Sequence, residues 1–117
     1  MVKHNFKKLI IWQESLELVI ETYKITKSFP SQEKFGLSSQ LNRCSVSIPS
    51  NIAEGTSKSS EKHFKNYLET SLGSAFEWET QIIIAHRVGY INQNEFTELE
   101  NRISKIQNMI YKFMTSL

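Results

Sequence analysis

The chain has 117 residues, of which 39% are apolar and 22% are charged, values typical of one folded domain. It contains only four glycines and two prolines, too few for the many turns of a β-sandwich or β-barrel. Its acidic residues are all glutamate, a good helix former, and its net charge of +2 allows a nucleic-acid partner without demanding one. Cys44 is the only cysteine, which excludes an internal disulfide and predicts a reducing, cytoplasmic location. No stretch is long and apolar enough to predict a signal peptide or a membrane span.

The first helix is expected over residues 8–28. Apolar side chains recur there at alternating steps of three and four residues, the spacing of one helix face. This predicted buried face consists of Leu9, Trp12, Leu16, Val19, Tyr23 and Thr26. Phe29 and Pro30 end the helix, because the residue before a proline is driven out of the α conformation.

The second helix is expected over residues 36–54. Its predicted buried face consists of Leu37, Leu41, Cys44, Ile48 and Ile52. Gly55 follows at once and is expected to end the helix in the left-handed conformation that glycine adopts easily.

The third and fourth helices are expected over residues 60–88 and 93–116. Asn92 and Glu95 form a predicted capping box at the start of the fourth helix, in which each side chain accepts from the other's backbone. The connections between helices are short, as is typical of antiparallel neighbours in a bundle. The sequence therefore predicts an all-α, up-down-up-down antiparallel four-helix bundle formed by a single domain of residues 1–117.

Residues that carry chemistry in enzymes do not form a recognisable motif. No glutamate precedes His4, His63 or His86 by three residues, which excludes the Glu-x-x-His motif of di-iron bundles. His63 is expected at the surface and His86 to be half-buried, while Cys44 lies on an apolar face and is expected to be an inert thiol. The glycines are isolated, and the serines lack the Gly-x-Ser-x-Gly elbow. We therefore expect no catalytic, metal or cofactor site, no small-molecule substrate and no enzymatic activity.

The second helix has an unusual surface, because small residues occupy positions where solvent favours Lys and Glu. A polar stripe runs beside its apolar face, and Glu79 of the third helix is expected to pair with Arg43 of this stripe. The stripe and its predicted partner comprise Gln40, Arg43, Ser47, Asn51, Glu54 and Glu79. Two interpretations remain open: the second helix is buried centrally within the monomer, or it forms a subunit interface.

Lysines gather at the N-terminus, at the end of the first helix and around the connection between the second and third helices. Each lysine alone is typical of a solvated surface, but repeated weak patches in an oligomer act together on one polyanion. The candidate nucleic-acid contacts are Lys3, Lys7, Lys8, Lys24, Lys27, Lys58, Lys62 and Lys65. Because no exposed aromatic platform is evident, any RNA or DNA binding is expected to be electrostatic and not to read sequence.

The run from Phe35 to Arg43 and the run Ser47-Ile48-Pro49-Ser50-Asn51-Ile52-Ala53-Glu54-Gly55 resemble the central motif of a bacterial family. This is the four-helix bundle protein family, also called the large-subunit rRNA intervening-sequence protein, or S23, family. Further matching segments are 9–13, Phe29-Pro30 with Glu33, 73–81 and 89–91, so that the resemblance covers nearly the whole chain.

The resemblance implies a bundle that assembles into a ring-like homopentamer without known enzymatic activity. It also implies a link to nucleic acid, because a related branch forms basic pentamers that bind nucleic acid and a reverse transcriptase. Two functions follow as alternatives. The chain is either an oligomeric RNA-binding protein or a protein-binding adaptor with no nucleic-acid role.

Overall fold

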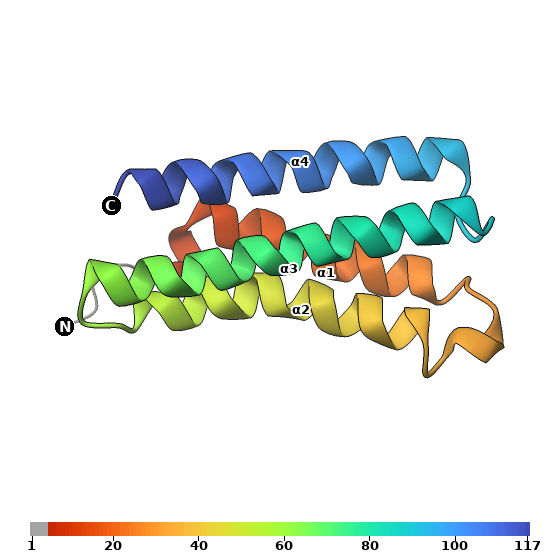
Figure 1. The fold of residues 1–117 in the computed structure, drawn as a ribbon, viewed down its shortest axis with the longest axis horizontal. Helices are drawn as coiled ribbons and strands as arrows, with labels where there is room; N and C mark the ends of the chain where they lie inside the picture. Colours follow the sequence, from red (N-terminus) through yellow and green to blue (C-terminus); the bar gives the residue numbers. More distant parts are fainter. Residues whose placement is uncertain (1–4) are drawn as a thin grey trace.

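The computed structural model describes residues 5–117, which form helices and no strand (Figure 1). The four main helices are α1 (Ile10–Thr26), α2 (Leu37–Thr56), α3 (Glu61–Arg87) and α4 (Gln93–Thr115). Single turns of 3-10 helix precede α1 and α2, namely η1 (Phe6–Lys8) and η2 (Ser31–Glu33). The prediction of an all-α fold with four helices is confirmed, and each helix begins and ends within two residues of its predicted bounds.

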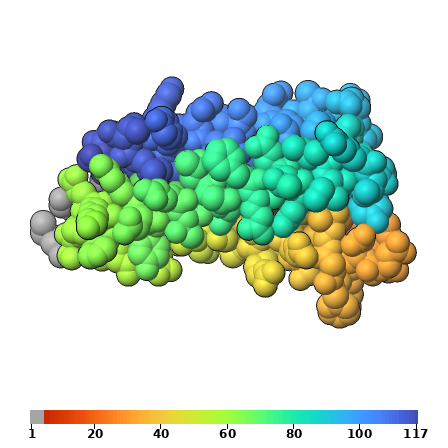
Figure 2. All heavy atoms as spheres, in the orientation of Figure 1, coloured from red at the N-terminus to blue at the C-terminus, as the bar shows by residue number. Residues whose placement is uncertain are grey.

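The molecule is elongated, with extents of 46 × 25 × 20 Å, and its helices lie along the long axis. The connection between α2 and α3 lies at one end together with the C-terminus (Figure 1). The connections α1–α2 and α3–α4 lie at the opposite end. The space-filling view shows the α1–α2 connection, in orange, projecting beyond the body of the bundle (Figure 2).

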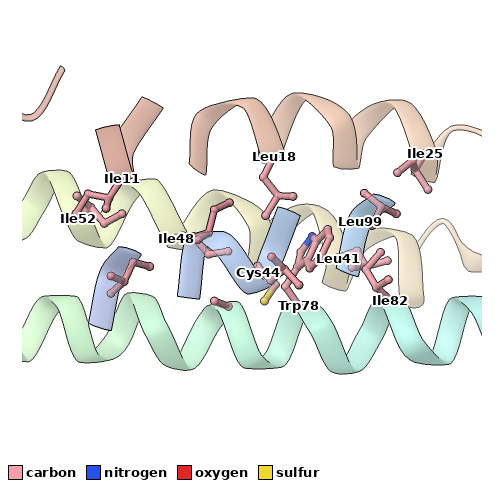
Figure 3. Packing of buried hydrophobic residues seen from close by; sticks show 14 of the residues in the cluster. Ile11, Leu18, Ile25, Leu41, Cys44, Ile48, Ile52, Trp78, Ile82 and Leu99 are labelled. Atoms are coloured by element: carbon pink, nitrogen blue, oxygen red, sulfur yellow. The ribbon is translucent and has the colours of Figure 1, made fainter. Parts of the chain in front are cut away.

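All four helices contribute to one apolar core, and the packing between α2 and α3 is the most extensive. Side chains such as Leu18 of α1, Leu41 of α2 and Trp78 of α3 point into the same interior (Figure 3). Trp78 is completely buried, and its indole Nε1 donates a hydrogen bond to Thr22 Oγ1 of α1 over 3.1 Å. This bond satisfies a buried donor that would otherwise destabilise the fold by about 1–3 kcal/mol.

The buried face of α1 differs from the predicted one. Ile11, Ser15, Leu18, Thr22 and Ile25 are buried. Of the predicted face, Thr26 is buried as expected, whereas Leu16 and Tyr23 are exposed. The hydroxyls of Ser15 and Thr22 donate to the carbonyl oxygens of Ile11 and Leu18, each over 2.6 Å, so both side chains are buried without losing a hydrogen-bond partner. Only part of the apolar stripe that was predicted to be buried is thus left on the surface.

The prediction that Gly55 ends the second helix is wrong. Gly55 is buried inside α2, which continues to Thr56. A Cβ atom at this position would lie 2.8 Å from Phe64 Cδ1 and 2.9 Å from Tyr67 Cβ, closer than packed atoms approach. Glycine is therefore needed here because α3 passes close to the backbone. The described glycine with positive φ is Gly89, at +89°, directly after α3.

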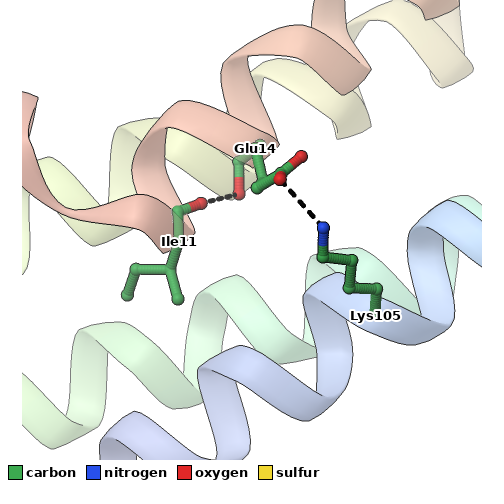
Figure 4. A network of polar contacts seen from close by, with 4 residues as sticks. Ile11, Glu14 and Lys105 are labelled. Atoms are coloured by element: carbon green, nitrogen blue, oxygen red, sulfur yellow. Dashed lines mark hydrogen bonds and ion pairs between the residues drawn. The ribbon is translucent and has the colours of Figure 1, made fainter.

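The polar contacts of α4 include one at its own N-terminus and one with α1. The predicted capping box is confirmed, since Asn92 Oδ1 accepts from the backbone of Glu95 over 2.8 Å and Glu95 Oε1 accepts from the backbone of Asn92 over 3.0 Å. Lys105 of α4 forms a 3.0 Å ion pair with Glu14 of α1 (Figure 4). Both residues of this pair are accessible to solvent, so it stabilises the bundle by about 1 kcal/mol at most.

Candidate functional site

The middle of the predicted polar stripe is a hydrogen-bonded seam between α2 and α3. Ser47 Oγ and Ser74 Oγ lie 2.8 Å apart, and Asn51 Nδ2 donates to the carbonyl oxygen of Ser47 over 2.8 Å. Ser71 of α3 donates to the carbonyl oxygen of Ile48 over 2.9 Å. The Ser47–Ser74 contact therefore joins α2 to α3 within the monomer, whereas the hydrogen bonds of Asn51 stay inside α2.

Cys44 belongs to the same seam and is buried as predicted. Its Sγ donates to the carbonyl oxygen of Ser74 over 3.0 Å. Burial, reinforced by the charge of Glu77, raises the pKa of the thiol to about 12. The thiolate is therefore not populated at neutral pH, and Cys44 has no nucleophilic character there.

The remaining members of the stripe do not join this seam. Gln40, Arg43 and Glu54 are exposed. The predicted pairing of Arg43 with Glu79 is wrong, because Glu79 faces α4, where its Oε1 accepts from Gln107 Nε2 over 2.8 Å. Position 79 lies on the side of α3 away from α2, whereas Ser71 and Ser74 lie on the side that α2 covers.

Glu79 has an acidic neighbour instead of a basic one. Burial, together with a hydrogen bond to Glu79 and its negative charge, raises the pKa of Glu100 to about 7. One oxygen of Glu100, Oε1, is buried without a hydrogen-bond partner. The α3–α4 contact therefore favours a protonated Glu100, which shares a hydrogen bond with the carboxylate of Glu79.

The candidate lysines lie in two groups at opposite ends of the molecule. Lys58, Lys62 and Lys65 follow the C-terminus of α2. The η1 turn, which carries the exposed Lys7 and Lys8, packs against α2 at that end (Figure 1). These five residues are called the basic end below. Lys24 and Lys27 close α1 near the opposite end, and Lys3 lies outside the described residues.

Sequence reasoning missed an exposed aromatic surface at the opposite end. Phe35, in the α1–α2 connection, is 89% exposed, and Tyr23 is 45% exposed. The expectation that no aromatic platform is exposed is therefore wrong. The available signal was the position of Phe35 between Lys34 and Gly36 in a connecting segment, since a phenylalanine there need not belong to either helix face.

His63 and His86 behave as expected. His63 is exposed, and His86 is half-buried against Phe96, whose ring centroid lies 4.2 Å away in a stacked arrangement. Within residues 5–117, no three histidine, cysteine or acidic side chains gather to form a metal site. None of the helices in that part of the chain has the length and apolar character needed to cross a bilayer.

Comparison with known proteins identifies the family. A solved structure from Bacteroides thetaiotaomicron, described as a protein of unknown function from the S23 ribosomal protein family, superimposes with a TM-score of 0.84. The two sequences are 25% identical, and the match covers 91% of this chain and 96% of that one. No curated protein matches the chain. The model of the 23S rRNA-intervening sequence protein family matches residues 7–112, and the chain therefore belongs to this family.

Proposed function

We propose that this chain is a non-enzymatic, oligomeric protein of the cytoplasm that associates with RNA through weak basic patches. The observation that carries the proposal is the basic end, where η1 and the α2–α3 connection bring together lysines distant in sequence. Lys7, Lys8 and Lys62 are exposed there, so their charges are available to phosphates. The name of the family, which refers to intervening sequences of 23S rRNA, makes RNA the favoured polyanion.

Assembly into a ring-like homopentamer of up-down-up-down bundles is the second part of the proposal. A closed ring with an odd number of subunits requires two different, complementary surfaces on each subunit. Exposed apolar side chains occur on two separate helical faces: Leu16, Ile20 and Val46 on α1 and α2, and Phe76, Ile84 and Val88 along α3 and its C-cap. Unpartnered apolar surface of this kind supports self-association.

The α1–α2 face also contains a groove, and some of the small residues of the second helix line it. The groove measures about 340 Å³, with Trp12, Leu16 and Val19 on one side and Val46, Pro49, Ser50 and Ala53 on the other. Small side chains on α2 leave room for the side chains of a neighbouring helix. For this outer face of α2, the subunit-interface interpretation is the one we adopt.

The RNA part is tested by fluorescence anisotropy with a labelled RNA over a salt series from about 50 to 300 mM. Replacing Lys58, Lys62 and Lys65 together with Gln is expected to weaken binding at low salt and to reduce the slope of log affinity against log salt by about two. The matched control replaces the same lysines with Arg, which preserves the charge and should preserve both quantities. Absence of binding by the parent at low salt would contradict the proposal.

A protein-binding adaptor remains the second candidate function, because the same apolar groove fits a helix of another protein. The two candidates separate on salt dependence. An adaptor without a nucleic-acid role would show no RNA binding at any salt concentration, and its partner binding would respond to substitutions in the groove, not at the basic end.

A further inference from the structure

The end of the molecule opposite the basic end carries two adjoining hollows. They measure about 390 and 510 Å³, lie beside the projecting α1–α2 connection, and share Tyr23, Lys34 and Asn42 in their walls. Phe35 and Arg43 line the larger hollow, and Lys27 lines the smaller one. Together they form one continuous surface, called the aromatic end below, that sequence reasoning did not assign.

Two aromatic rings of the aromatic end face solvent. Phe35 is the most exposed large apolar residue among those described, at 89%, and Tyr23 is 45% exposed. The ammonium group of Lys34 lies 5.5 Å from the centroid of the Phe35 ring, so a cation already accompanies this ring. An exposed aromatic ring with a lysine ammonium over it combines a flat apolar surface with a positive charge.

The charges of this surface are of one sign. Lys27, Lys34 and Arg43 line the hollows, and none of the lining residues is acidic. Glu33 belongs to the same connection but does not line either hollow, because its carboxylate accepts from the backbone of Leu37 over 3.1 Å and from the hydroxyl of Tyr90 over 2.7 Å. The surface therefore attracts an anion, with no carboxylate in its walls to repel one.

Hydrogen-bond donors complete the surface. Asn42 Oδ1 accepts from Thr26 Oγ1 over 2.9 Å. This bond fixes the orientation of the amide group and leaves its NH₂ able to donate. Three features thus lie together: exposed aromatic faces, cations and an oriented amide donor. A ligand that matches all of them has flat rings, negative charges at regular intervals and hydrogen-bond acceptors.

We propose that the aromatic end binds an unpaired segment of RNA. One base would stack on Phe35 and another on Tyr23, while Lys27, Lys34 and Arg43 contact the flanking phosphates. Bases are available for stacking on side chains only where they are not paired, so the surface selects single strands, loops or bulges over duplex. This inference rests on the proposed RNA association and deepens it. The basic end attracts the phosphates of single-stranded and duplex RNA alike, whereas the aromatic end would select unpaired bases.

The test uses fluorescence anisotropy with two labelled probes, a single-stranded RNA of about twelve nucleotides and a duplex of the same length. Replacing Phe35 with Ala is expected to weaken single-strand binding by roughly tenfold, the loss typical of one stacked base, and to leave duplex binding unchanged. Replacing Phe35 with Trp should keep single-strand binding within about threefold, because stacking needs only an aromatic face. Because Phe35 is exposed, the substitutions should leave the thermal unfolding midpoint unchanged.

The outcomes separate this inference from the proposed function. If the parent binds RNA and Phe35→Ala binds both probes as well as the parent, the stacking site is overturned and the RNA association stands. Equal losses on both probes also overturn it, because stacking cannot act on paired bases. If Phe35→Ala lowers the mass in light scattering, Phe35 is a contact between copies and the inference fails. If the parent binds neither probe, the proposed function fails with it.

Discussion

The hydroxyl of Tyr90 donates a hydrogen bond to the carboxylate of Glu33 over 2.7 Å, joining the α3–α4 connection to the α1–α2 connection. The other carboxylate oxygen, Glu33 Oε1, accepts from the backbone of Leu37 at the start of α2. Tyr90 also packs against Phe29, with ring centroids 5.3 Å apart. Gly36 makes this arrangement possible, since a Cβ there would lie 2.8 Å from the same carboxylate oxygen. The projecting connection is therefore tied to the bundle through a side chain distant in sequence.

Replacing Tyr90 with Phe is expected to lower the thermal unfolding midpoint, because the ring remains but the donor to Glu33 is lost. The hydrogen bonds from Leu37 and Tyr90 lower the pKa of Glu33 in the folded state. Because the pKa is lowered in the folded state, the hydrogen bonds of ionised Glu33 contribute to the free energy of unfolding above the unfolded pKa of about 4.5. This contribution is lost as pH falls through the folded pKa. Unfolding midpoints of parent and variant should therefore converge in acid, and a constant difference at every pH would contradict this assignment.

Replacing Gly55 with Ala is expected to destabilise the protein by about 1–3 kcal/mol, since the added methyl group would overlap with Phe64 and Tyr67. Gly73 offers a matched control, because it lies inside α3 and nothing approaches its missing Cβ within 4 Å. Gly73→Ala should stabilise the helix by roughly 0.5–1 kcal/mol. In chemical denaturation, the two variants should change the free energy of unfolding in opposite directions if α3 packs closely against Gly55. Changes in the same direction would contradict this packing.

Replacing Glu100 with Gln is expected to remove a pH-dependent loss of stability. The pKa of Glu100 is raised to about 7, so the contribution of its protonated form is fully present below about pH 4.5 and is lost as pH rises through 7. Because this group is only partly buried and solvent screens its interactions, we expect a change of only about 1 kcal/mol. Denaturation at about pH 5.5 and pH 8 should show the parent losing stability at the higher pH and Glu100→Gln losing less. An identical loss in both would exclude Glu100 as the titrating group.

Replacing Ser50 or Ala53 with Arg is expected to disrupt the assembly, because each lines the groove between α1 and α2. Overpacking of this kind costs on the order of a few kcal/mol. Ser104→Arg, on the exposed side of α4, is the control with the same change of charge. Light scattering should give an oligomer for the parent and control and a smaller mass for the groove variants. A monomeric parent would end the oligomer proposal, and an intact oligomer in both groove variants would move the interface elsewhere.

Helix positions followed from the sequence because periodic apolar residues, Phe29-Pro30 and the Asn92–Glu95 cap are all local signals. The buried face of α1 did not follow, since hydroxyl side chains at positions 15 and 22 count as polar until their bonds to the backbone are known. The role of Gly55 was equally inaccessible, because it depends on the path of α3. Conformational preference alone favoured the wrong explanation of that glycine.

The candidate site was predictable only in part. The lysines around the α2–α3 connection could be located from the predicted helix bounds. The structure shows that η1, which carries Lys7 and Lys8, lies at the same end. That Arg43 and Glu79 do not pair could not be predicted without knowing which sides of α3 face α2 and α4. Phe35 was missed because exposure of a side chain in a connection depends on what the rest of the fold leaves uncovered.

The positions of the two tryptophans make the protein its own spectroscopic reporter. Trp78 is completely buried and bonded to Thr22, so its emission should be blue-shifted and should change when the monomer unfolds. Trp12 is only partly buried and lines the groove between α1 and α2, so its emission should shift when a second chain covers that groove. In a Trp12→Phe variant, the remaining emission of Trp78 reports folding. A shift in emission on dilution that the parent shows and this variant lacks reports dissociation.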